Sequence, residues 1–156
     1  MSQPSLETKL AIHEALARSA YALDERQMDV LEAGFAEDAR LEIVIAGADP
    51  IQFESRETIM GLMRDSADTQ TDIRRHVTTN VFFEDTNSST EVRCTANLTI
   101  TAVENGAIRL VTSGYYKDRF VLNGNNWLIA HRVIACLLYT SPSPRDLSTS
   151  RMPSSA

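Results

Sequence analysis

Residues 74–83 combine side chains that can do acid–base chemistry with the pattern of a β-strand. The segment reads Arg-Arg-His-Val-Thr-Thr-Asn-Val-Phe-Phe, which is rich in β-branched and aromatic residues and contains neither Gly nor Pro. Alternate residues of a strand share a face. We therefore expect four side chains on one face: His76, Thr78, Asn80 and Phe82. Three hydrogen-bonding groups beside an aromatic ring suit a pocket wall, and the alternative is a half-buried histidine bonded to a neighbour.

A carboxylate that suits His76 occurs near the end of the first predicted helix, at Asp24. Imidazole is the side chain that most readily exchanges a proton near neutral pH, and it needs one bare nitrogen to act as a base. A carboxylate bonded to the other nitrogen fixes that tautomer and stabilises the imidazolium ion that forms. Asp24 and His76 are therefore a candidate general-base pair. For a single Asp, a solvated turn position is the alternative.

Composition excludes several other classes of function. The chain has 156 residues, 43% of them hydrophobic, which suits one domain with a real core. Its net charge of −6 argues against nucleic-acid binding. It contains neither an apolar run long enough to span a membrane nor a secretory signal, so we expect a cytoplasmic protein. Cys94 and Cys136 fall in apolar strand patterns and are expected to be buried free thiols.

No metal or cofactor is expected. His13 and His131 form no ligand-spaced cluster with Asp, Glu or Cys, and no phosphate loop, nucleophile elbow or dinucleotide motif occurs. His131 precedes Arg132 in a predicted strand, so the two side chains should point to opposite faces.

The order of elements predicts an α+β fold. Helical patterns are expected at 5–24, from 29 through Phe35, and at 56–64, with strands at 39–46, 74–83, 91–103, 108–121 and 126–138. Residues 65–72 are polar and predict a mobile loop, while Asn-Gly at 105–106 and the segment 123–125 predict hairpin turns. The result would be a curved antiparallel sheet with helices on one face, which leaves a concave apolar cavity for a small molecule.

The composition changes abruptly after residue 139. Residues 140–156 are dominated by Ser, Thr and Pro and lack any hydrophobic period. The segment also resembles the translated adapter sequence found at the ends of reading frames in metagenomic assemblies. We therefore assign residues 1–139 to the domain and treat 140–156 as a non-native or disordered tail.

Four fragments in order resemble a known family: 21–27 (YALDERQ), 75–80 (RHVTTN), 114–120 (GYYKDRF) and 127–132 (WLIAHR). They are similar to the SnoaL-like branch of the nuclear transport factor two-like (NTF2-like) superfamily, over about residues 5–136. That branch includes scytalone dehydratase, bile acid 7α-dehydratase and hexachlorocyclohexane dehydrochlorinase. The resemblance implies a cone-shaped half-barrel in which three N-terminal helical segments and a curved sheet enclose an apolar pocket.

The resemblance also implies roles for particular residues. The dehydratases and the dehydrochlorinase pair an Asp at the end of the first helix with a strand His, positions that match Asp24 and His76. A late-strand Arg of the dehydrochlorinase matches Arg132. We expect Arg132 to hold a polar or anionic group, and a surface Arg paired with a carboxylate is the alternative. The Lys of the dehydrochlorinase is Ser19 here, and the Tyr that precedes the Asp of scytalone dehydratase is Leu23.

These two departures leave the helper for the leaving group unassigned. Tyr21, Tyr115 and Tyr116 are candidates for it, and nothing in the sequence selects among them. Tyr21, Tyr116 and Asn80 are expected to bind the substrate. For Asn80 the alternative is an amide that caps a neighbouring backbone group.

The expected function is that of a cofactor-independent lyase, a dehydratase or related elimination or isomerisation enzyme, acting on a small hydrophobic substrate. Two alternatives stay open: a non-catalytic β-type subunit of an aromatic-ring hydroxylating dioxygenase, and a ligand-binding domain without turnover. By analogy with the superfamily, we expect a homodimer or homotrimer.

Overall fold

The computed structural model describes residues 1–139, so the proposed tail at 140–156 lies outside the described residues. Within the described part, three helices and six strands follow one another along the chain. They are α1 (Leu6–Asp24), α2 (Met28–Ala33), β1 (Phe35–Ile45), β2 (Ile51–Glu54), α3 (Arg56–Thr69), β3 (Ile73–Phe83), β4 (Glu91–Glu104), β5 (Ala107–Asn123) and β6 (Asn126–Tyr139).

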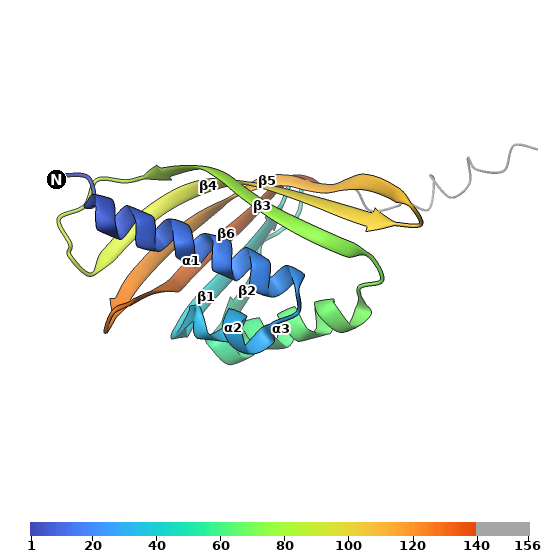
Figure 1. Ribbon diagram of the computed structural model, residues 1–156, viewed down its shortest axis with the longest axis horizontal. Coiled ribbons are helices and arrows are strands. Elements are labelled where there is room, and N and C mark those ends of the chain that lie inside the picture. The colour runs from blue at the N-terminus through green and yellow to red at the C-terminus, as the bar shows by residue number, and fades with distance from the viewer. Residues whose placement is uncertain (140–156) are drawn as a thin grey trace, which may run out of the picture.

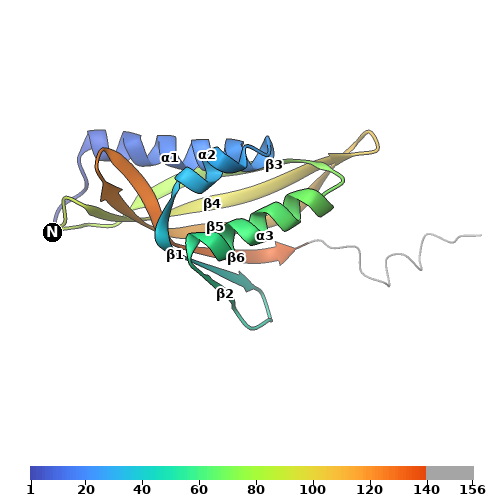
Figure 2. The same ribbon diagram turned by 90° about the horizontal axis from the view of Figure 1, so that it is seen from below.

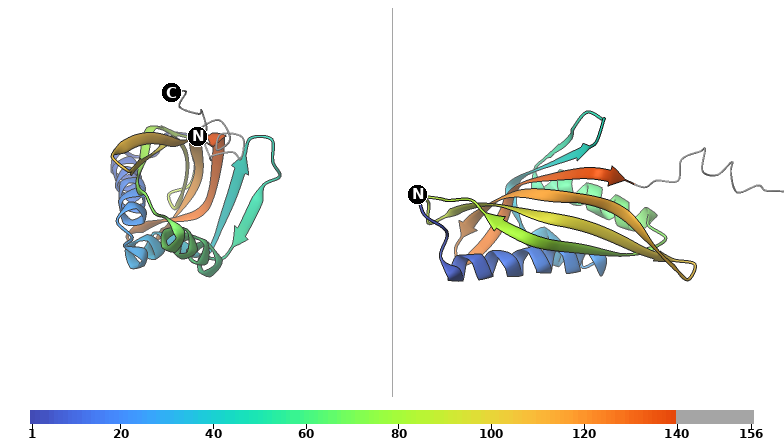
Figure 3. Two further views of the ribbon diagram at one scale, coloured as in Figure 1. Left: turned by 90° about the vertical axis from the view of Figure 1, so that its right-hand side faces the viewer. Right: turned by 90° about the horizontal axis from the view of Figure 1, so that it is seen from above.

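The six strands form one curved sheet in the order β2-β1-β6-β5-β4-β3. All neighbours are antiparallel except β1 and β6, which run parallel. The helices lie on one side of this sheet (Figures 1 and 2). Seen from its end, the sheet curls, and α1 and α3 cover the open side of the curl (Figure 3). The predicted α+β half-barrel is therefore confirmed, with one parallel pair in its sheet.

The hydrophobic core lies between the helices and the concave face of the sheet. Ile12 and Leu16 of α1, together with Ile59 of α3, are almost fully buried against sheet residues such as Phe120 and Ile129. These side chains recur at helical spacing on the helices and at alternate positions on the strands, which is why the sequence pattern identified their elements.

Short-range chemistry defines the ends of the elements. The Ser5 hydroxyl accepts a hydrogen bond from the Thr8 backbone N–H at 3.1 Å and caps α1 where the sequence predicted its start. Asn105 and Gly106 both have positive φ angles, 51° and 74°, which gives the β4–β5 hairpin a type I′ turn. Both predicted hairpin turns are present, since β5 and β6 are joined through Gly124.

Two expectations about elements are wrong, and one strand was not predicted. The segment predicted as a loop at 65–72 is mostly the last part of α3, which continues to Thr69 and buries Ala67. Its solvent-facing residues are so polar that they hid the helical period. Phe35, expected in the second helix, begins β1, and the short strand β2 was not predicted. With only four residues, β2 is too short for its alternation to be recognised.

A β-bulge in β3 changes which side chains face the helices. Thr79 is paired with Asn97 of β4, but Phe82 is paired with Thr95, so one extra residue lies between them. Asn80 takes the left-handed conformation, with φ of 54°, at this point. The alternation therefore reverses, and Phe82 is 68% exposed. The prediction that Asn80 and Phe82 continue the face of His76 is wrong for this reason.

Asn80→Ala should lower the free energy of unfolding by about 1 kcal/mol, because Ala tolerates the left-handed region less well than Asn does. Asn80→Gly should leave stability unchanged or slightly raised, since Gly adopts positive φ freely. Urea denaturation of the two variants measures the difference. Equal stability of the Ala and Gly variants would show that backbone strain at the bulge is not what Asn relieves.

Candidate active site

A cavity of about 200 Å³ lies between the concave face of the sheet and the helices. Its apolar lining comes from both layers and includes Leu16, Leu23, Phe35, Met63, Leu98 and Ile134. Its polar lining consists of Ser19, Arg26, Ser66, Gln70, Arg74, His76, Tyr116 and Arg132. An apolar cavity of about 150 Å³ holds one benzene molecule, so this volume suits a ligand of one substituted ring or two small fused rings.

Asp24 and His76 meet at the wall of this cavity. Asp24 is the last residue of α1, and His76 lies in the first half of β3. The Asp24 Oδ1 atom lies 2.6 Å from the ring Nδ1 of His76, and its Oδ2 atom accepts the backbone N–H of His76 at 2.9 Å. Only 4% of the Asp24 side chain and 12% of the His76 side chain are exposed. The carboxylate thus fixes both the ring and the strand that carries it.

This contact determines which ring nitrogen a ligand can use. An ionised carboxylate only accepts hydrogen bonds, so Nδ1 of a neutral His76 has to carry the proton. The lone pair of the neutral ring is then on Nε2. Because His76 lines the cavity, Nε2 is the nitrogen available to a bound molecule.

Tyr116 and Arg132 form the second polar group of the cavity. Both are buried, on β5 and β6 respectively, and the Arg132 guanidinium lies 3.9 Å from the centre of the Tyr116 ring. Arg132 also donates two hydrogen bonds to Asp118, Nε to Oδ1 at 2.8 Å and Nη2 to Oδ2 at 2.7 Å. The pair is bidentate and buried, so most of the charge of Arg132 is balanced within the protein.

Burial and neighbouring charges together determine the protonation of these groups. It raises the pKa of Tyr116 to about 12, against a smaller lowering by Arg132, so the phenol stays protonated and can donate a hydrogen bond at neutral pH. Burial alone would lower the pKa of Arg132, but the Asp118 carboxylate outweighs it and raises that pKa. Burial also raises the pKa of the Cys94 thiol to about 12, so Cys94 is an unreactive core residue.

A bulge places Arg132 opposite Asp118. Next to the β5–β6 turn, Leu122 is paired with Trp127 and Phe120 with Ile129. If this register continued along the strands, Asp118 would be paired with His131. One extra residue in β6 shifts the register, so that Asp118 is paired with Arg132 instead. Asp118 was missed as a site residue because nothing in the sequence marks this bulge.

The predicted site residues divide into two groups. Asp24, His76, Tyr116 and Arg132 all lie at the cavity, and the last three line it. Tyr21 is 61% exposed on α1 and does not line it. Asn80 does not line it either, because the β3 bulge turns it outward. The sequence reading also missed Arg26, Gln70 and Arg74, which are polar residues at element ends and resemble ordinary surface positions.

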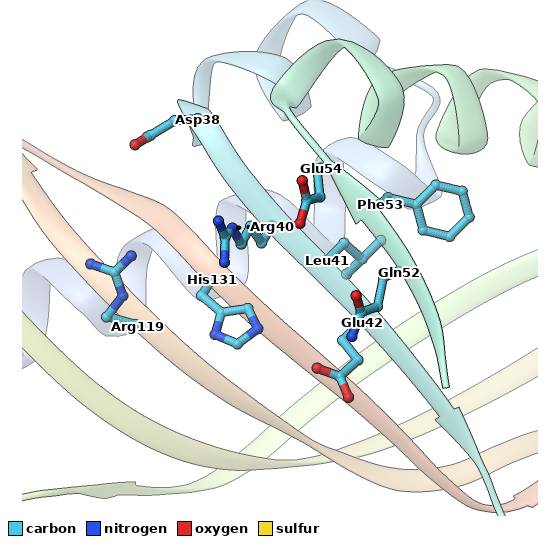
Figure 4. A pocket seen from close by; sticks show the side chains of 9 residues that line it. All are labelled: Asp38, Arg40, Leu41, Glu42, Gln52, Phe53, Glu54, Arg119 and His131. Carbon is cyan, nitrogen blue, oxygen red and sulfur yellow. Dashed lines mark ion pairs between the residues drawn. The ribbon is translucent and has the colours of Figure 1, made fainter. Parts of the chain in front are cut away.

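A second hollow, of about 480 Å³, lies on the other side of the strands (Figure 4). Figure 4 shows that His131 and Arg119 lie in it with the side chains of β1 and β2, among them the ion pair of Arg40 with Glu54 at 4.0 Å. His131 therefore faces away from Arg132, as predicted. Basic and acidic groups alternate along this hollow, so it has no dominant charge.

The sequence profile of the SnoaL-like domain matches residues 4–133. The chain belongs to the SnoaL-like family. The match includes all four predicted site residues at the cavity and most of each strand of the sheet. No curated protein is similar enough in sequence to count as a relative of this SnoaL-like chain.

Solved structures of similar shape agree with this family. A protein from Novosphingobium aromaticivorans assigned as a scytalone dehydratase is 20% identical, with a TM-score of 0.73 over 86% of this chain and 87% of that chain. A protein from the same organism assigned as the β subunit of an aromatic-ring-hydroxylating dioxygenase is 17% identical, with a TM-score of 0.74 over 85% and 91%. At such identities the likeness shows the fold alone.

The described part of the chain contains neither a metal-ligand cluster nor a membrane-spanning helix. No three His, Cys, Asp or Glu residues among residues 1–139 gather closely enough to hold a metal ion. No helix within the same range is long and apolar enough to cross a membrane.

Proposed function

We propose that this SnoaL-like protein is a cofactor-independent lyase, a dehydratase or a related elimination or isomerisation enzyme, acting on a small hydrophobic substrate. One observation carries the proposal: the ring of His76 stands at the wall of an apolar cavity, with Nδ1 held by the buried carboxylate of Asp24. That arrangement is what a general base needs, because it leaves one bare nitrogen and stabilises the charge that the ring gains.

In the proposed elimination, Nε2 of His76 takes a proton from a carbon of the substrate. The electrons of that C–H bond form the new C=C bond, and the leaving group departs from the adjacent carbon with its bonding electrons. The protonated Tyr116 donates a hydrogen bond to the departing group. The imidazolium then returns its proton to the released hydroxide or to water, which restores the starting state.

We propose a different role for Arg132 from the one that its sequence position suggested. Asp118 occupies the Nε and Nη2 atoms of Arg132 and balances its charge. Arg132 therefore positions the ring of Tyr116 and is not the main binding group for an anionic substrate. The apolar part of the lining lowers the polarity around the base, which strengthens each of these polar contacts.

Asp24→Asn should lower kcat by about 10²- to 10⁴-fold and cost less than about 2 kcal/mol of stability. The amide oxygen can accept only one of the two hydrogen bonds that the carboxylate receives from His76, and the neutral side chain does not stabilise the imidazolium. Kinetics on a substrate found by screening small cyclic alcohols for dehydration give the first value, and urea denaturation gives the second.

The ¹⁵N NMR shifts of the His76 ring provide the control for this variant. In the wild type they should report a proton on Nδ1, and in Asp24→Asn a mixture of tautomers, while those of His13 and His131 stay unchanged. If the tautomer and the rate of the variant equal those of the wild type, the carboxylate plays no part in catalysis.

The rival functions make different predictions about assembly. The structural neighbour assigned as a dioxygenase β subunit favours a non-catalytic subunit as the second candidate. We propose instead that the protein forms a homodimer or homotrimer by itself. Light scattering of the purified protein tests this: a defined homo-oligomer favours the enzyme, whereas insolubility that a co-expressed α subunit relieves favours the subunit. A ligand-binding domain would bind the substrates without converting them.

A further inference from the structure

The mouth of the cavity carries a cationic cluster that the general-base chemistry does not use. Arg26 follows the end of α1 and Arg74 lies near the start of β3, and both line the cavity. Gln70, directly after α3, joins them: its backbone carbonyl accepts a hydrogen bond from Nη2 of Arg26 at 3.1 Å. Three elements thus bring two guanidinium groups to one opening.

Arg26 occupies a backbone position that does not suit an arginine. The N–H of Gln27 bonds to the carbonyl of Ala22 at 2.8 Å, and the N–H of Arg26 bonds to that of Leu23 at 3.2 Å. This is a Schellman motif, and its left-handed residue is ordinarily Gly or Asn. Here that residue is Arg26, with φ of 57°. A strained residue beside a cavity points to a role for its side chain.

The charges at the mouth are not balanced. Asp72 is buried and accepts hydrogen bonds from Nε and Nη2 of Arg74, at 2.8 and 3.4 Å, and from Nη2 of Arg109 at 2.7 Å. One carboxylate thus serves two guanidinium groups, and the Nη1 group of Arg74 is left for a ligand. Glu25, the neighbour of Arg26, is paired with Arg75 instead. Among residues 1–139, no carboxylate forms an ion pair with Arg26. The opening therefore carries an excess of positive charge, in a chain whose net charge is −6.

We propose that the substrate is a small cyclic carboxylate, whose apolar ring fills the cavity beside His76 and whose carboxylate group lies at the mouth between Arg26 and Arg74. Arg26, which uses only one donor on Gln70, can offer paired donors to a carboxylate, and Arg74 adds its Nη1 group. The apolar cavity of about 200 Å³ matches the ring. This inference rests on the proposed function, because it takes the cavity to be the substrate site.

A matched pair of probes tests the charge requirement. 1-Naphthoate and 1-naphthamide have nearly the same shape, and only the first carries a charge at neutral pH. In calorimetry at low salt, the wild type should bind the naphthoate at least about tenfold more tightly than the amide, and added salt should reduce the difference. Equal affinity for the two probes, or no binding of naphthoate, would overturn the proposal.

Substitutions then locate the anion site. Arg26→Gly should weaken naphthoate binding about fivefold to tenfold, leave amide binding unchanged, and keep or raise the melting temperature, because Gly suits the left-handed position. Arg74→Gln should weaken naphthoate binding to a similar extent. The fold should tolerate this change, because Asp72 keeps Arg109 as its partner. Arg93→Gln removes the same charge from an exposed position outside the cavity and serves as the control. Loss of affinity in Arg93→Gln equal to that in Arg26→Gly would mean that net charge, not this site, attracts the acid.

These binding results are separate from those on catalysis. If His76→Ala retained turnover, the general-base function would fail while the preference for the carboxylate stood. If the amide bound as tightly as the acid, the substrate class would be wrong while the role of His76 stood.

Discussion

His76→Ala is expected to lower kcat/KM by about 10²- to 10⁴-fold, the range that a positioned general base contributes. The fold should survive, because the side chain lies at the edge strand of the sheet and the backbone N–H that bonds to Asp24 remains. Steady-state kinetics on a substrate identified by screening measures the loss, and circular dichroism checks that the secondary structure is unchanged.

His131→Ala is the matched control for this experiment. His131 lies on the other side of the strands and does not line the cavity, so its removal should leave kcat/KM unchanged. A His76→Ala variant with full activity would end the general-base proposal. A variant that loses activity together with its fold would be replaced by His76→Gln, which keeps a polar side chain of similar length.

Asp118→Ala is expected to have the largest effect on stability, about 3–5 kcal/mol. Arg132 and Asp118 are almost fully buried, and removal of the carboxylate leaves the guanidinium charge uncompensated in the core. An arginine side chain keeps its proton near neutral pH even when it is buried, so loss of the proton does not relieve this cost. In a domain of this size the melting temperature should fall by about 10 °C or more, which calorimetry measures.

Two further variants show that the buried charge is the cause. The double variant Asp118→Leu with Arg132→Met should recover most of the stability, since an apolar pair leaves no charge unpaired. Glu91→Ala removes a partner of Arg93 and Arg119 at the surface and should cost less than about 1 kcal/mol. If Asp118→Ala cost no more than Glu91→Ala, the buried pair would not be a major contributor to stability.

Much of the fold could be predicted because local patterns determine it. The apolar period of α1, the cap at Ser5 and the Asn-Gly turn each depend on residues close together in the chain. The pairing of β1 with β6 in parallel was not predicted, because it joins segments that are far apart in sequence and leaves no local signal. The polar end of α3 was misread because its few buried positions did not reveal a period.

The site was predictable to the extent that strand alternation holds. His76 and Arg132 lie at the cavity, but one extra residue in β3 turns Asn80 outward and one in β6 brings Arg132 opposite Asp118. A bulge depends on how two strands fit together, so neither strand reveals it alone. Arg26 was missed for a related reason, since only its φ angle distinguishes it from a surface residue in a turn.

The contact between Asp24 and the backbone of His76 has a consequence for self-association. β3 is an edge strand, and an unpaired N–H on such a strand can donate a hydrogen bond to a strand of another molecule. At His76 that N–H is already occupied by the carboxylate, at 2.9 Å. The group that orients the ring therefore also protects the edge against strand addition between copies. Loss of Asp24 would remove both functions together, so aggregation in such a variant would have its origin in the active-site geometry.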